Sequence, residues 1–358
     1  MLPSPFPHHG PLAADQVHGR DGLIDDLVER VTARRPTVLV APRRFGKTSV
    51  LGAVAERIGE QCTVIRVDLY ELRSWVDFAA RLADSLASVT GSGRGALDRV
   101  AAGLEINLGV IKANVVRMPK DAGDTTADQL LDLAIAHAER HPTAIFLDEF
   151  SSIGRVDGAA GLLRTKVQHH LSRVGLLFAG SEPSTMRMLF TDVDQPFYAQ
   201  ADLVEVPPLS LTALTEIVAA GFDGDPPDGL AANIHAFTSG HPQRSMQLAD
   251  AAWSMRDEVP GTGLDLWAAA LERCRVSTAD GHETRFAGLS TADQAVLRLA
   301  AGGGALFGAG ADRLDLSRSS AQLGRRRLID RGQLMVTDHG VAVVDPLYAD
   351  WIRHRFPL

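Results

Sequence analysis

Near the start of the chain, a short apolar segment leads directly into a glycine-lysine-threonine triplet. The apolar segment is Thr37–Val40, and the sequence continues Ala41-Pro-Arg-Arg-Phe-Gly-Lys-Thr48 before helical spacing resumes. This fits the pattern G-x-x-x-x-G-K-[ST], in which backbone N–H groups of the loop and of the next helix hold β- and γ-phosphates. Ala41 replaces the first glycine, a change that costs little if φ there is not positive. The sequence therefore predicts a phosphate-binding loop between a strand and a helix.

The residue types in this loop have separate roles. Gly46 lets the backbone approach a phosphate closely, Lys47 neutralises phosphate charge, and the Thr48 hydroxyl is a ligand for Mg²⁺. Arg43 and Arg44 are either solvated or part of a partner interface. The residues expected to contact the nucleotide in this loop are Ala41, Pro42, Arg43, Arg44, Phe45, Gly46, Lys47, Thr48 and Ser49.

Two carboxylates follow a second apolar run, Ala144–Leu147. Ligands bind at the carboxyl ends of strands in open parallel sheets, so Asp148 is expected beside the phosphate loop. There Asp148 would hold Mg²⁺, and Glu149 would act as the general base toward an attacking water. An acidic pair after a strand is also a common helix N-cap, but the upstream phosphate loop favours the catalytic interpretation.

A third polar position follows the apolar run Gly175–Ala179, where the sequence continues Gly-Ser-Glu. Ser181 or Glu182 could sense the γ-phosphate or orient the water. The alternative is a helix N-cap for residues 183–190, and the sequence does not decide between the two.

Composition limits the class of protein. The 358 residues are 45% hydrophobic with a net charge of −8, so no overall field attracts nucleic acid or anionic lipid. Two cysteines are too few for a disulfide framework, and no apolar run reaches the roughly 20 residues of a membrane span. The first residues lack the pattern of a signal peptide, and we expect a cytoplasmic protein without membrane partners.

The order of elements predicts an α/β protein. Strand-like runs alternate with amphipathic helices as far as about residue 206, which is typical of a parallel sheet. Residues 104–118 alternate around Gly109, and we expect a hairpin insertion there. We expect three domains: an α/β core at 1–210, a helical lid at 211–282, and a module of short helices and a hairpin at 283–358.

Several motifs together resemble the archaeal-type P-loop ATPases of the signal-transducing STAND class, relatives of the AAA+ proteins. The likeness covers nearly the whole chain and implies a P-loop NTPase core, a helical lid and a C-terminal winged helix. The motifs that carry it are His18-Gly19-Arg20, Ala41 to Thr48, Leu147-Asp-Glu-Phe150, Gly180-Ser181, Pro196-Phe-Tyr198, Thr238-Ser-Gly-His-Pro242 and Asp345-Pro-Leu-Tyr-Ala-Asp-Trp351.

The resemblance implies further site residues and one departure. Gly19 and Arg20 would lie near adenine, and Pro242 would pack on the base. Where relatives carry arginine after Pro-Leu-Tyr-Gly, this chain has Gln200, which suggests slow hydrolysis. Arg187 and Arg244 are the remaining candidates for an arginine finger.

The segment Ser317–Arg331 predicts a helix before the C-terminal hairpin, where a winged helix carries its recognition helix. Its arginines Arg318, Arg325, Arg326 and Arg327 are candidate DNA contacts. Nearby acidic residues almost balance this charge, and winged helices of this class also pack on the ATPase core. The sequence leaves both alternatives open.

His137 and His141 lie four residues apart, a spacing at which two histidines can bind one metal. The segment is not H-E-x-x-H and ends before Pro142, so we expect a surface helix end instead.

These observations lead to one functional hypothesis with two rivals. We expect an ATPase that binds ATP or ADP with Mg²⁺ and acts as a molecular switch with a protein partner or by self-association. The rivals are a DNA-binding initiator-like ATPase and a scaffold that holds nucleotide with negligible turnover.

Overall fold

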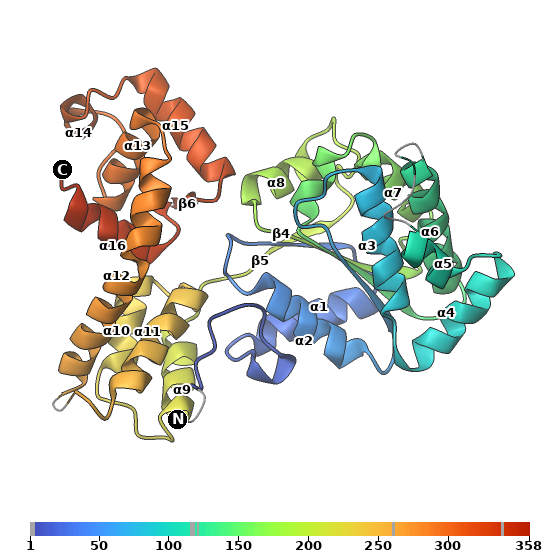
Figure 1. Ribbon diagram of the computed structural model, residues 1–358, viewed down its shortest axis with the longest axis horizontal. Helices are drawn as coiled ribbons and strands as arrows, with labels where there is room; N and C mark the ends of the chain where they lie inside the picture. The colour runs from blue at the N-terminus through green and yellow to red at the C-terminus, as the bar shows by residue number, and fades with distance from the viewer. Residues whose placement is uncertain (1–3, 115–118, 120–121, 260–261, 338–339) are drawn as a thin grey trace. The chain divides into compact units, whose positions relative to one another are not determined.

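The computed structural model describes residues 4–114, 119, 122–259, 262–337 and 340–358. By its internal contacts the chain divides into two compact units (Figure 1). One, which we call the α/β unit, comprises residues 13–41 and 47–206. The other, which we call the helical unit, comprises residues 1–12, 42–46 and 207–358.

A five-stranded parallel sheet forms the centre of the α/β unit, in the order β2-β3-β4-β1-β5. The strands β1, β3 and β4 are buried along their whole length, as expected where helices cover both faces. The α/β fold with a parallel sheet that the sequence predicts is confirmed. The strands are β1 (Thr37–Val40), β2 (Thr63–Asp68), β3 (Thr143–Asp148), β4 (Val174–Gly180) and β5 (Asp202–Glu205).

Helices cover the two faces of this sheet, with α1 and α2 on one side and α3, α6 and α7 on the other (Figure 1). A Cβ atom at position 175 would lie 2.7 Å from Val31 Cγ1, so Gly175 in β4 allows α1 to pack closely. The helices are η1 (Ala14–Gln16), α1 (Asp21–Thr32), α2 (Lys47–Ile58), α3 (Trp75–Ala87), α4 (Gly91–Gly103), α5 (Leu108–Asn114), α6 (Gly123–Ala138), η4 (Phe150–Arg155), α7 (Ala159–Val167) and α8 (Pro183–Thr191).

The hairpin expected at residues 104–118 is wrong. This part of the chain begins at Leu104, the C-cap of α4, and contains all of α5, and residues 115–118 lie outside the described residues. Leu108 is buried and Ile111 packs against the same core, whereas Val110 is exposed. Burial at i and i+3 is the helical period, which a short apolar run does not distinguish from a strand.

Four helices form the first part of the helical unit around a core that includes Phe6, Leu214 and Leu248. The 25-residue α12 was not predicted, because its apolar residues do not form a stripe on one face. Its length would cross a bilayer, but none of the described helices combines such length with an apolar composition. The four are α9 (Leu211–Gly221), α10 (Leu230–Thr238), α11 (Pro242–Met255) and α12 (Gly263–Ala287).

The rest of the helical unit has three helices, an antiparallel hairpin and a last helix. Their shared core includes Val296, Leu328 and Tyr348. The basic helix and the hairpin lie where the sequence predicts them, although the hairpin turn, residues 338–339, is outside the described residues. The elements are α13 (Thr291–Ala301), α14 (Ala309–Arg313), α15 (Arg318–Asp330), β6 (Leu334–Thr337), β7 (Gly340–Val343) and α16 (Pro346–Arg355).

Candidate functional site

The phosphate loop occupies the turn between β1, which ends at Val40, and α2, which begins at Lys47. Gly46 has φ of 86°, and no atom lies within 4 Å of the position that a Cβ would take there. A side chain at this position would be strained and would fill open space at the start of a helix. Such a space at the N-terminus of a helix fits a phosphate.

Lys47 and Ala41 lie at the two ends of this loop and contact each other. Lys47 is buried, and its Nζ donates to the carbonyl oxygen of Ala41 at 2.9 Å. Ala41 is not among the residues with positive φ, so the condition under which alanine can replace glycine is met. Ser49, in the first turn of α2, is also buried.

Thr48 and Asp148 are brought together by the sheet order. They come from α2 and the end of β3, and the Thr48 hydroxyl donates to Asp148 Oδ2 at 2.8 Å. Burial raises the pKa of Asp148 above its ordinary value, although the Thr48 hydrogen bond acts in the opposite direction. A hydroxyl and a carboxylate in contact are the hard oxygen ligands that Mg²⁺ prefers, so these residues fit that ion.

Glu149 and Ser181 also meet, across the ends of the neighbouring strands β3 and β4. The Ser181 hydroxyl and backbone N–H donate to Glu149 Oε2, at 2.6 and 3.1 Å. Glu149 has φ of 49° and ψ of 41°, in the left-handed region that a non-glycine residue adopts only at a cost. Glu182, not Ser181, occupies the N-cap position of α8. Ser181 is therefore in position to hold the Glu149 carboxylate.

Gly19 and Arg20 precede α1 in the α/β unit. Gly19 has φ of 68°, and Arg20, the N-cap residue of α1, is buried. Burial lowers the pKa of Arg20 to about 10. Keeping a guanidinium out of water disfavours its charged form, which is why its pKa falls.

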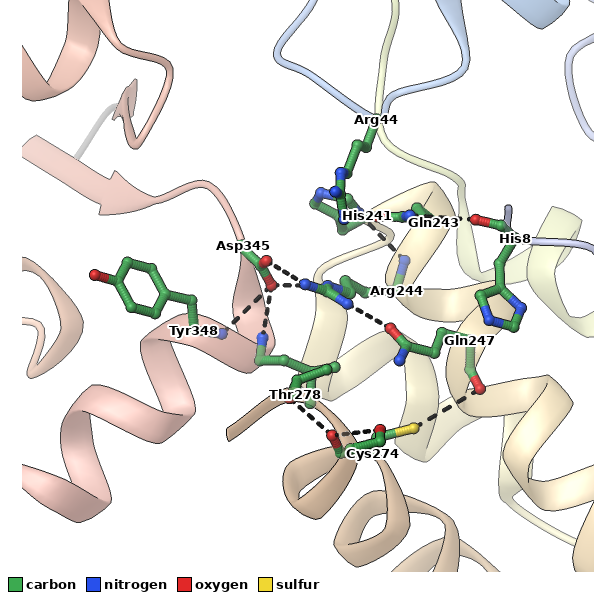
Figure 2. Close-up of polar contacts among 12 residues, drawn as sticks. His8, Arg44, His241, Gln243, Arg244, Gln247, Cys274, Thr278, Asp345 and Tyr348 are labelled. Atoms are coloured by element: carbon green, nitrogen blue, oxygen red, sulfur yellow. Dashed lines mark hydrogen bonds and ion pairs between the residues drawn. The ribbon is translucent and has the colours of Figure 1, made fainter. Parts of the chain in front are cut away.

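Within the helical unit, the tip of the phosphate loop contacts the start of α11 (Figure 2). The rings of Phe45 and His241 meet edge to face with centroids 5.0 Å apart, and Arg44 Nη1 donates to Gln243 Oε1 at 3.1 Å. Pro242 is the first residue of α11, and His241 caps it by accepting from the Arg244 N–H. Burial lowers the pKa of His241 to about 4, which keeps its ring neutral.

Both arginine-finger candidates are in ion pairs. Arg187 pairs with Glu205. Arg244 is buried and forms a two-pronged pair with Asp345, including an Nε to Oδ1 bond of 2.9 Å (Figure 2). The sequence indicates Arg244 as a finger candidate and Asp345 as part of a motif, but not the contact between them. The side-chain oxygen of Gln200, the residue that departs from the family pattern, is buried without a hydrogen-bond partner among the described residues.

The arginines of the basic helix α15 make two kinds of contact. Arg327 pairs with the buried carboxylate of Asp293 at 2.7 Å, so it helps to join α15 to α13. Arg318 lies over the Phe307 ring, and Arg326 is exposed. Three of the four candidates, Arg318, Arg325 and Arg326, therefore remain outside carboxylate pairs among the described residues.

The histidine pair at the end of α6 differs from the expectation. His137 is fully buried rather than on the surface, and its Nε2 lies 3.1 Å from Thr63 Oγ1. Burial lowers the pKa of His137 to about 4. No group of three or more metal-binding side chains occurs in the described part of the chain.

Comparison with known proteins supports the fold. No protein-family model and no curated protein sequence matches the chain. The Walker-type ATPase PABY2304 of Pyrococcus abyssi is similar in structure, with a TM-score of 0.71 over 98% of this chain and 99% of that one at 17% identity. The ADP form of the Aeropyrum pernix ORC2 protein gives a TM-score of 0.54 over 99% and 98% of the two chains at 16% identity. The chain thus has a P-loop NTPase fold, shared with these structures along nearly its entire length.

Proposed function

We propose that this protein is an Mg²⁺-dependent ATPase of the archaeal-type STAND class that acts as a molecular switch. The observation that carries the proposal is the arrangement after β1 and β3. There Thr48 contacts Asp148, and Glu149 follows directly, its carboxylate held by Ser181. These contacts support the proposal because a phosphate loop, two magnesium ligands and a base are the parts that phosphoryl transfer to water needs.

The loop residues bind and orient the triphosphate. Lys47 Nζ exchanges its bond to the Ala41 carbonyl for phosphate oxygens, and the N–H groups that follow Gly46 donate to the same anion. Thr48 and Asp148 would hold the Mg²⁺ ion, which would supply positive charge beside the phosphates. By resemblance, Gly19 and Arg20 contact the adenine, and so does Pro242.

Glu149 accepts the proton of the attacking water, and the products are ADP and phosphate. Both hydrogen bonds from Ser181 go to Oε2, which leaves Oε1 for the water among the described contacts. A positioned base of this kind contributes about a hundredfold to ten-thousandfold to the rate. We assign Ser181 as the positioning residue of that base.

The switch rests on the contacts of the loop tip. Arg44 and Phe45 contact Gln243 and His241 on α11, so a change at the loop on ATP binding or hydrolysis is felt by α11. Arg244 on α11 in turn pairs with Asp345 before α16. We assign residues 1–210 to the ATPase core, 211–282 to the lid and 283–358 to a winged helix. Equal affinity for ATP and ADP, with unchanged protease sensitivity of residues 205–285, would contradict the switch.

Replacing Lys47 with alanine tests nucleotide binding. We expect Lys47→Ala to weaken ATP binding about a hundredfold, because a buried charge and its charge-assisted bonds to phosphate are lost. Binding is measured with a fluorescent ATP analogue in the presence of Mg²⁺. The exposed Lys112, replaced in the same way, is the matched control and should bind like the wild type. Equal affinity in the two variants would contradict the proposed site.

DNA binding is a second candidate function, favoured by one observation on α15. Arg318, Arg325 and Arg326 are spaced i, i+7 and i+8, so they lie on one side of the helix. None of the three forms an ion pair with a carboxylate among the described residues. If this face contacts phosphates, replacing Arg325 and Arg326 together with alanine lowers the slope of log affinity against log salt by about 2. Duplex binding is followed by anisotropy, with Arg313→Ala on α14 as the control. No binding by the wild type at low salt would exclude this candidate.

A further inference from the structure

A second cationic site lies within the helical unit, and neither Lys47 nor Thr48 is part of it. It is a cavity of about 540 Å³, a size suited to a small organic ligand. Its wall is formed by the loop tip, the start of α11, the end of α12, the residues before β6 and the N-cap of α16. Its charged residues are Arg43, Arg44, Arg244, Arg285, Arg331 and Asp345.

Among the described residues, this wall holds more arginines than carboxylates. Asp345 is its single carboxylate among them, and Arg244 already takes it in a two-pronged pair (Figure 2). Arg44 donates to a neutral amide, and the Arg285 guanidinium lies 4.4 Å from the centre of the Tyr348 ring. Burial lowers the pKa of Arg285; Tyr348 and Asp345 act to raise it, and the nearby charges of Arg44 and Arg244 act to lower it. Guanidinium groups gathered in this way repel one another unless an anion lies among them.

Two buried polar atoms in the same wall also lack partners in the described part of the chain. They are His282 Nε2 and Gln333 Oε1. Burial lowers the pKa of His282 to about 4, so the neutral ring offers one N–H donor. Gln333 Oε1 is an acceptor, so it would accept from an O–H group of the ligand, such as a protonated phosphate. Buried polar groups without partners are rare, and here they border a cavity rather than packed side chains.

We propose that this cavity binds a small polyanion with adjacent phosphate groups. A guanidinium group can donate two parallel hydrogen bonds to the oxygens of one phosphate. Several guanidinium groups around one cavity therefore suit a ligand with several negative charges. His282 and Arg244 are buried in the wall, which fits an enclosed small molecule better than the phosphate backbone of a duplex. Because the wall joins the loop tip, α11, α12 and the α16 N-cap, the ligand links the C-terminal helices and hairpin to the loop. This site goes beyond the proposed function: Arg43 and Arg44 of the phosphate loop are part of its wall, but neither Lys47 nor Thr48 contributes to it.

The test uses inorganic pyrophosphate and the full chain, by calorimetric titration without Mg²⁺. We expect the wild type to bind two equivalents, one at the phosphate loop and one in the cavity. The Lys47→Ala variant should lose the first and retain the second. In that background, Arg331→Gln and Arg285→Gln should each weaken the remaining binding roughly tenfold, through loss of charge-assisted bonds.

Arg326→Gln on α15 is the matched control, because Arg326 is exposed and outside the cavity wall. Arg331 is exposed too, so Arg331→Gln tests the site even if Arg285→Gln destabilises the fold. A Lys47→Ala variant that binds no pyrophosphate would overturn the proposal. Equal weakening by Arg326→Gln and Arg331→Gln, or displacement of pyrophosphate by duplex DNA, would also overturn it. Binding of one equivalent that only Arg331→Gln weakens would support the cavity and contradict the proposed nucleotide site instead.

Discussion

Replacing Glu149 with glutamine is expected to lower phosphate release from ATP by about a hundredfold to ten-thousandfold and to leave nucleotide binding intact. Glutamine has nearly the shape of glutamate and can still accept the Ser181 bonds, but it cannot take a proton from water. The measurement is steady-state phosphate release with Mg²⁺, beside the affinity for ATP.

A matched control is Glu182→Gln, one residue after Ser181. Glu182 is the N-cap residue of α8 and accepts from Thr185, so its contacts lie outside the Glu149 group. We expect its turnover to equal that of the wild type. If Glu149→Gln and Glu182→Gln turn over at the same rate, Glu149 is not the base. Bound ADP without turnover in the wild type would favour the scaffold alternative.

The role of Ser181 is tested by combining Ser181→Ala with Glu149→Gln. If Ser181 acts by holding Glu149, Ser181→Ala lowers kcat about tenfold in the wild type and has no further effect in Glu149→Gln. A residue that only stabilises the fold would lower the rate by the same factor in both backgrounds. The affinity for ATP should be unchanged in each variant.

The parts of the site that the sequence predicts are those that depend on local order. Lys47 and Thr48 follow a strand within one short segment, and Asp148 and Glu149 directly end another. For such residues, strand, turn and helix determine the position of each side chain almost without reference to the rest of the chain. The parallel sheet follows from the same alternation of strands and helices.

The contacts that the sequence does not determine are those between distant segments. Whether Ser181 caps a helix or holds Glu149 depends on β3 and β4 being neighbours, which strand patterns alone do not reveal. The expectation of a surface position for His137 failed because its environment is set by Thr63 on another element. The helix α12 was missed because it carries no apolar stripe, and the Arg244–Asp345 contact spans 101 residues.

The second large effect is expected at the contact between Arg244 and Asp345. The side chains of Arg244 and Asp345 are 8% and 13% exposed, and Asp345 also caps α16 by accepting from the N–H groups of Leu347 and Tyr348. Asparagine at position 345 keeps a capping oxygen but removes the charge. A buried guanidinium then loses its counter-ion, and we expect Asp345→Asn to lower the free energy of unfolding by about 3–5 kcal/mol.

Urea denaturation followed by tryptophan fluorescence measures this loss. Three of the four tryptophans, Trp253, Trp267 and Trp351, lie in the helical unit that holds the pair, so the signal reports mainly on that unit. The exposed Asp330, replaced by asparagine at the end of α15, is the control and should change stability by no more than about 0.5 kcal/mol. Equal stability of the two variants would mean that the pair contributes nothing.

The pH dependence gives an independent check of the same pair. Burial would raise the pKa of Asp345, but the hydrogen bonds and charge of Arg244 outweigh it, and the pKa lies below its ordinary value. A carboxylate whose pKa is lowered by folding stabilises the protein above its unfolded pKa, near about 3.9, and loses that contribution as the pH falls through the folded value. His241 and His282 also face Asp345 and would gain charge at low pH. The wild type and Asp345→Asn therefore have to be compared in the same buffers. We therefore expect the difference between the wild type and Asp345→Asn to be full at pH 7 and to shrink below about pH 4. A difference that stays constant down to pH 3 would show that packing, rather than the ion pair, accounts for the loss.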